Sequence, residues 1–237
     1  MSRLVWWLAA LCCTACAVLV CWAWIDRPLA FWIDAHRLGE VARSGFRPLT
    51  VLPDPLIPMG ALAFLVLGLR ALAGGRLGRS SSVIVVCLFA LMTTETIKNV
   101  LKWVFGRPWP VSWRGEDPSL IRTGDYAFHW LAGGAAYSSF PSGHMAAAAA
   151  VLSVLWIYYP RLRAVCITLI ILVGAGLVGS NFHFAGDVLA GAFTGISVAW
   201  MSTSLFSQLR LRGPSTIGQP QDAAERQEAA KCRTGTK

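Results

Sequence analysis

The chain has 237 residues, of which 55% are hydrophobic and only 14% charged, and its formal net charge is +9. A soluble globular domain has about 25% charged residues. This composition excludes a disordered chain, a collagen-like chain and a small disulfide-linked scaffold. The basic residues lie at the ends of long apolar runs instead of forming one dense patch, so we expect a membrane protein with no nucleic-acid partner.

Six apolar runs follow one another along the chain, most of them close to the length of about 17–25 residues that a bilayer-crossing helix needs. We therefore predict an all-α fold, a polytopic membrane bundle of six transmembrane helices. The six runs are Leu4–Ile25, Leu56–Leu72, Val83–Phe105, Met145–Tyr159, Ala164–Asn181 and Val188–Leu205.

The runs divide the chain into three expected regions. Residues 1–48 hold the first transmembrane helix and an interfacial segment, with an amphipathic helix within Ala30–Arg47. Residues 49–208 form the membrane core. Residues 209–237 are polar and lack an apolar period, which predicts a disordered cytoplasmic tail.

The first run has features of both a signal peptide and a retained helix. Arg3 and the apolar centre suit a signal peptide. The run is longer than the usual signal-peptide core of about 7–15 residues and ends in a Trp22–Trp24 cluster, so a retained helix is favoured over a cleaved one.

Charge sets the expected orientation in the membrane. The short linkers at 73–80 and 160–163 carry Arg and no acidic residue. The positive-inside rule places these linkers in the cytoplasm. We therefore expect a multi-pass protein of the cell inner (plasma) membrane, with both termini cytoplasmic and the long loop 106–143 extracytoplasmic.

Charged residues interrupt the third run, where an intramembrane charge is costly. Glu95, Lys98 and Lys102 are spaced i, i+3 and i+7, so they share one face of a helix. We expect Lys98 to form a structural ion pair with Glu95. Lys102, near the extracytoplasmic end, is expected to face a polar cavity.

A Pro-Ser-Gly-His sequence precedes the fourth run. Pro141 suits a helix entry, and Gly143 allows close approach of another group to the backbone. The free N–H groups of the helix start, together with the Ser142 hydroxyl, can bind an anion, and His144 adds a group that titrates near neutral pH. The alternative is an ordinary helix cap with an interfacial histidine.

His183 and Asp187 lie at the entrance to the sixth run with i, i+4 spacing. A carboxylate at this spacing can accept the imidazole N–H and fix the tautomer of the ring, as in nucleophilic catalysis. The alternative is a surface His–Asp pair.

His144, His183 and Asp187 could together hold a metal ion. The cationic surroundings, with Lys102 and Arg107, favour a phosphate instead. We therefore expect no metal and no cofactor.

Three segments resemble, in order, the three signature motifs of the type 2 phosphatidic acid phosphatase family: Lys102 to Arg107, Pro141 to His144, and His183 to Asp187. The resemblance covers roughly residues 50–205. The resemblance implies that His183 attacks phosphorus and forms a phosphohistidine. It implies that Asp187 orients His183 and that His144 protonates the leaving oxygen.

The same resemblance implies a set of phosphate-binding groups, with two departures from the family pattern. By the family spacing, Trp109 stands where a motif arginine is expected after Lys102, and Leu177 stands where another is expected before His183. We expect Arg107, Asn181, His129 or a loop arginine to replace these guanidinium groups. The implied phosphate-binding residues are Lys102, Arg107, Ser142 and Gly143.

The expected function is that of an integral membrane lipid-phosphate phosphatase, which acts on a membrane lipid whose chains remain in the bilayer. The alternatives are a lipid phosphotransferase with the same machinery and a catalytically weakened lipid-binding protein. A haloperoxidase is disfavoured because the chain is so rich in membrane segments.

Overall fold

A computed structural model describes residues 3–36, 38, 53–74, 78–112 and 117–212. Over these residues the chain is helical, and its only β-type pairings are two isolated bridges. The chain forms two compact units, Met1–Thr203 and Ser204–Lys237. The site discussed below lies entirely in the first unit, and so does the expected region boundary at residue 48.

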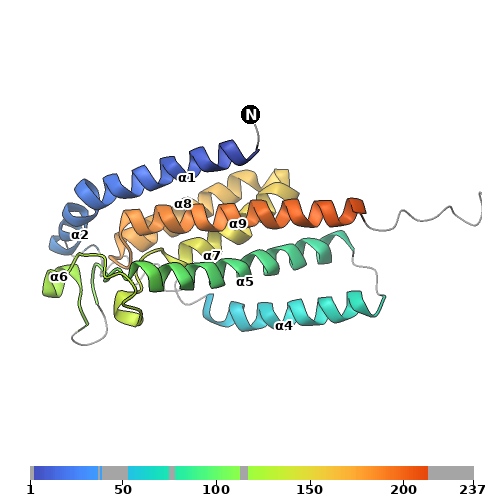
Figure 1. The fold of residues 1–237 in the computed structure, drawn as a ribbon, viewed down its shortest axis with the longest axis horizontal. Coiled ribbons are helices and arrows are strands. Elements are labelled where there is room, and N and C mark those ends of the chain that lie inside the picture. Colours follow the sequence, from blue (N-terminus) through green and yellow to red (C-terminus); the bar gives the residue numbers. More distant parts are fainter. Residues whose placement is uncertain (1–2, 37, 39–52, 75–77, 113–116, 213–237) are drawn as a thin grey trace, which may run out of the picture. The chain divides into compact units, whose positions relative to one another are not determined.

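Long helices and the loops between them make up the first unit (Figure 1). A π-helical turn, Cys21–Ile25, joins α1 to α2, and short 3₁₀ turns occur at Ala135–Tyr137 and Pro160–Leu162. The α-helices are α1 (Arg3–Val20), α2 (Asp26–Ala35), α4 (Pro53–Leu72), α5 (Arg79–Phe105), α6 (Leu120–Thr123), α7 (Gly143–Tyr158), α8 (Arg163–Gly179) and α9 (Ala185–Arg212).

Each of the six predicted apolar runs coincides with a helix, which confirms the all-α membrane fold. Four stretches of the described chain are long and apolar enough to cross a bilayer, whereas α4 and α7 contribute shorter apolar segments. The chain is therefore a multi-pass membrane protein, and six crossings stay a prediction. The four long stretches are Leu4–Ala35, Ser80–Phe105, Pro160–Gly179 and Ala185–Gln208.

The first helical stretch is longer than predicted. It continues through the π-helical turn to Ala35, beyond the expected end at Ile25. The predicted interfacial helix within Ala30–Arg47 falls mostly outside the described residues. At the other end of the chain α9 reaches Arg212, so residues 209–212 of the predicted disordered tail are helical, and the rest of that predicted tail also lies outside the described residues.

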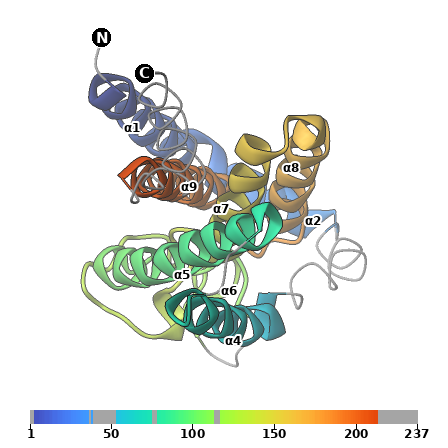
Figure 2. The ribbon, with the colours of Figure 1, turned by 90° about the vertical axis from the view of Figure 1, so that its right-hand side faces the viewer.

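Helix α7 lies between α5, α8 and α9 and forms the centre of the first unit (Figure 2). Its Ala146, Ala149 and Ala150 are completely buried. Gly191 and Gly195 of α9 lie against the α7 backbone, where a Cβ atom at either position would collide with it. Small residues thus allow these two helices to pack backbone to backbone.

One end of the first unit gathers the starts of α7 and α9, the end of α5, and the short helices α2 and α6 (Figure 1). Helix α5 ends there because Gly106 adopts a left-handed conformation (φ 53°) and its N–H bonds to the Lys102 carbonyl. A Cβ at Gly106 would collide with the His129 carbonyl, so only glycine fits this turn. Arg161 and Arg163 follow the far end of α7, away from this gathering.

Candidate active site

The two histidines expected in the site come together at this end of the unit. The ring centroids of His144 and His183 are 6.4 Å apart. His144 is the second residue of α7 and is partly exposed, whereas His183 lies just before α9 and is 3% exposed. In the described part of the chain no three His, Cys, Asp or Glu side chains gather as a potential metal site.

A hydroxyl and a carboxylate hold the His183 ring. Nδ1 of His183 lies 3.6 Å from Oδ2 of Asp187 and 3.5 Å from Oγ of Ser139. The Ser139 hydroxyl donates a hydrogen bond of 2.5 Å to the same carboxylate oxygen, which also accepts the Phe184 N–H at 3.2 Å. Both neighbours of Nδ1 can accept its proton, so this arrangement favours the tautomer that leaves Nε2 unprotonated.

Burial lowers the pKa of His183 from 6.5 to about 4, and the contacts with Asp187 offset only part of this effect. The electrostatic influence of the neighbouring Lys102 and His144 adds to the lowering of this pKa. The ring is therefore neutral at physiological pH. A neutral imidazole has the lone pair that a nucleophile needs.

Ser142 and Gly143 form the start of α7. The Ser142 hydroxyl accepts the Met145 N–H at 3.4 Å and so caps the helix, as in the alternative interpretation of this motif. The Ser142 N–H donates to the Asp187 carbonyl at 3.0 Å and links the starts of α7 and α9. Gly143 is buried and lies directly against the Lys98 side chain.

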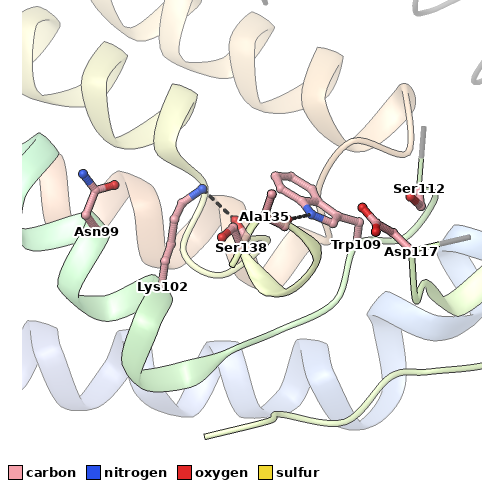
Figure 3. Close-up of a pocket in the computed structure, with 7 residues that line it drawn as sticks. All are labelled: Asn99, Lys102, Trp109, Ser112, Asp117, Ala135 and Ser138. Carbon is pink, nitrogen blue, oxygen red and sulfur yellow. Dashed lines mark hydrogen bonds between the residues drawn. The ribbon is translucent and has the colours of Figure 1, made fainter. Parts of the chain in front are cut away.

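Lys102 reaches across from α5 to the loop before α7. Its ammonium donates a 2.6 Å hydrogen bond to the Ser138 carbonyl and lies 5.4 Å from the centre of the Trp109 ring. Lys102 also lines a cavity of about 310 Å³. Figure 3 shows Asn99 one turn before Lys102 on α5, and Trp109 between Lys102 and Asp117 in this view.

Trp109 covers the nucleophile candidate. Its ring centre lies 5.0 Å from that of His183, and its indole N–H donates to the Ala135 carbonyl at 2.8 Å. An aromatic ring thus stands beside His183 at the position where the family spacing calls for a guanidinium group. Trp109 also lines the cavity next to Lys102, so the same ring borders both this cavity and His183.

Arg107 does not face the cavity, which argues against its expected phosphate-binding role. Its side chain is completely buried and donates to Asp187 at 2.6 Å and to Asp26 at 2.9 Å. The Phe184 ring lies 4.0 Å from its guanidinium carbon. Both terminal nitrogens are therefore used by carboxylates, and the guanidinium serves to hold Asp187 in place.

Two of the other expected replacements for the missing arginines, His129 and Asn181, are also engaged elsewhere. Nε2 of His129 lies 2.9 Å from both Asp125 carboxylate oxygens. The Asn181 amide donates to the Ala30 carbonyl at 3.0 Å.

Glu95 and Lys98 form the predicted ion pair, with 2.6 Å between charged atoms.

Two residues of this cluster were missed by the sequence analysis. Asp26 comes from the first helical stretch, bonds to Arg107 and accepts the Gly186 N–H at 3.0 Å. The sequence offered one indication of a role for Asp26, namely that it is a lone acidic residue at the end of an apolar run. Ser139 lies two residues before the expected Pro-Ser-Gly-His motif and has no sequence signal apart from that proximity.

Comparison with known proteins agrees with the motif pattern. The model of the PAP2 superfamily matches residues 83–211, which leaves α1, α2 and Asp26 outside the match. A lipid A 1-phosphatase from Rhizobium johnstonii is 30% identical over 114 residues, or 48% of this chain and 43% of that protein. A lipid A 1-phosphatase from Rhizobium etli is 33% identical over 100 residues, or 42% of this chain and 40% of that protein. The matched stretch thus spans less than half the length of these curated relatives.

A solved structure also aligns with most of the chain. It is a PAP2-type phosphatidylglycerolphosphate phosphatase from Bacillus subtilis, with a TM-score of 0.42 and 20% sequence identity. The alignment covers 87% of this chain and 88% of the other.

Proposed function

Because the chain belongs to the PAP2 superfamily, we propose that it is an integral membrane lipid-phosphate phosphatase with its active site at His144 and His183. The observation that carries this proposal is the approach of the two rings to 6.4 Å, with Asp187 and Ser139 beside Nδ1 of His183. A nucleophile, a second titratable ring and an orienting carboxylate are thereby assembled from segments far apart in the sequence.

In the proposed reaction, Nε2 of His183 attacks the phosphorus of the lipid phosphate. The new P–N bond forms as the P–O bond to the lipid breaks, and His144 donates a proton to the departing oxygen. Water, deprotonated by His144, then attacks the phosphohistidine, which releases inorganic phosphate and regenerates His183. Asp187 stabilises the positive ring between the two steps, and Arg107 holds Asp187 in place.

Charge stabilisation supplies most of the catalysis in phosphoryl transfer. In this site Lys102, the Ser142 hydroxyl and the N–H groups at the start of α7 would bind the phosphate oxygens. His183 is 3% exposed beneath Trp109, so the Trp109 ring has to shift before phosphorus can reach Nε2.

The substrate we propose is a phosphorylated membrane lipid. Long apolar helices lead directly into the site, which lets the acyl chains remain in the bilayer while the headgroup reaches the histidines. Lipid A carrying a 1-phosphate is the first substrate to test, because it is the one named for the two curated relatives.

We place the chain in the inner membrane with the site on the extracytoplasmic side and both termini in the cytoplasm. The support is that Arg161 and Arg163 lie beyond the end of α7 opposite to the site.

The test is phosphate release from labelled lipid A 1-phosphate by the purified full-length protein in detergent with a metal chelator. We expect release by the wild type and by His129→Ala, and none by His183→Ala. His129 is a matched control because it lies in the neighbouring loop and pairs with Asp125. Release by His183→Ala at the wild-type rate would contradict the proposal, and label appearing in a second lipid would indicate a phosphotransferase.

A second candidate function, binding of a lipid phosphate without turnover, is favoured by the position of Trp109 over His183. Under this alternative the wild type binds lipid A 1-phosphate in detergent but releases no phosphate. His144→Ala would then leave the affinity for the lipid unchanged.

A further inference from the structure

A phosphate group bound beside His183 carries more negative charge than one ammonium neutralises. Buried anions in proteins are paired with cations or hydrogen-bond donors. Lys102 supplies one positive charge on the cavity wall. The guanidinium of Arg107, by contrast, is bound by Asp26 and Asp187.

Lys98 lies one helical turn before Lys102 on the same face of α5. Its ammonium approaches Gly143 so closely that a Cβ on this glycine would lie 2.9 Å from Nζ. Gly143 is the first residue of α7, and its backbone N–H lies in the first helical turn, where no acceptor stands four residues earlier in the helix. The Lys98 ammonium therefore lies directly against the start of α7.

The Lys98 side chain is 16% exposed, and its ammonium has three donors, of which Glu95 takes one. Asn99, the next residue of α5, lines the same cavity as Lys102 (Figure 3). The cavity wall thus includes the residue that follows Lys98, while the Lys98 ammonium itself lies against Gly143.

From this juxtaposition we infer that Lys98 is a second phosphate-binding cation, which acts with Lys102 on an anion held at the start of α7. Glu95 is its counter-ion when the site is empty and moderates its attraction for the anion when the site is filled. The inference rests on the proposed function for the location of the phosphate. It adds a binding role to a residue that the sequence analysis interpreted as structural.

The test uses inorganic phosphate, so it does not depend on turnover. Binding of labelled phosphate to the full-length protein in detergent is measured by equilibrium dialysis. Loss of one charge-assisted hydrogen bond should weaken binding about tenfold in Lys98→Met, and Lys98→Arg should restore the affinity to within about threefold of wild type.

Glu95→Gln gives an opposite and independent result. Loss of the competing carboxylate releases the Lys98 ammonium to the bound anion, which should tighten phosphate binding by about threefold. A lysine that served only the ion pair would give no tightening. This variant keeps Lys98 and decides the question even where Lys98→Met fails to fold.

Arg163→Met is the matched control, because it also removes one positive charge but lies about 24 Å away, at the far end of the 16-residue helix α7. Its phosphate affinity should equal that of the wild type. The inference is overturned if Lys98→Met binds phosphate within twofold of wild type, if Glu95→Gln does not tighten binding, or if the wild type binds no phosphate. Absence of lipid turnover, with this pattern of phosphate affinities intact, would count against the proposed function alone.

Discussion

Arg107 and the two lysines Lys98 and Lys102 lie at the same end of the molecule in opposite surroundings. Arg107 is completely buried, and its charge is held between Asp26 and Asp187. Lys98 and Lys102 lie on one face of α5, partly exposed and next to a cavity and the start of α7. Arginine suits the first role because its planar fork can bind two carboxylates at once, whereas the lysine ammonium is a mobile point charge suited to a transient anion.

The comparison shows that a positive residue near a catalytic motif does not identify a substrate-binding group. What separates the two roles is the local supply of carboxylates. Arg107 has two buried carboxylates within hydrogen-bond distance, and Lys102 has a backbone carbonyl. We therefore expect Arg107 to matter first for stability and the lysines for anion affinity.

The largest expected effect is that of Arg107→Met on folding. Removal of the guanidinium leaves two buried carboxylates without their cation, which should lower the free energy of unfolding by about 3–5 kcal/mol. Thermal unfolding of the protein in detergent measures this loss. Lys98→Met should cost less than about 1 kcal/mol, because its ion pair is partly exposed. Similar stabilities of the two variants would contradict the view that Arg107 matters first for stability and Lys98 for anion affinity.

Asp26→Ala should have the next largest effect. It deletes the acceptor for both Arg107 and the Gly186 N–H, with an expected loss of about 3 kcal/mol in the free energy of unfolding. Asp26→Asn keeps an acceptor and should cost less than half as much. Asp34→Ala is the control, because Asp34 is an exposed acidic residue of the same helix. An equal loss in the two alanine variants would show that the hydrogen bonds of Asp26 contribute nothing.

Acid should destabilise the protein through His183. Its pKa is lowered to about 4 by burial, so between pH 6.5 and 4 the unfolded chain takes up a proton that the folded chain does not. Stability should therefore fall by about 2 kcal/mol from pH 7.5 to pH 5. Unfolding measured at both pH values in wild type and His183→Gln isolates this contribution. The same pH dependence in both proteins would contradict the lowered pKa.

Trp109→Arg should have the smallest effect. It tests whether a cation placed beside the cavity that Lys102 lines contributes to anion binding. A guanidinium beside Lys102 should tighten the binding of inorganic phosphate by about tenfold, because it adds a charge-assisted hydrogen bond. Trp130→Arg is the control, since Trp130 is an exposed tryptophan of the same connecting loop. Unchanged phosphate affinity in Trp109→Arg would mean that this position does not face the anion.

The sequence was sufficient to predict the helices and the meeting of the two histidines. Both follow from local patterns, namely apolar runs of bilayer length and helix-start motifs that fall on the same side of the membrane. The partners of Arg107 could not be predicted, because Asp26 and Asp187 are 161 residues apart in number and only the packing of α1 and α2 brings Asp26 to the site. The positions of Trp109 and Ser139 depend on the course of an irregular loop, which no periodicity encodes.

The backbone contact between α7 and α9 has a mechanical consequence. Gly191 and Gly195 let α9 pack directly on the α7 backbone, so we expect the pair to act as one stiff support for the histidines at its end. Under the proposed function, lipid headgroups of different size would then be accommodated on the side of the site where Trp109 lies. Adaptation to another lipid phosphate would accordingly change the residues around Trp109 and spare the two glycines.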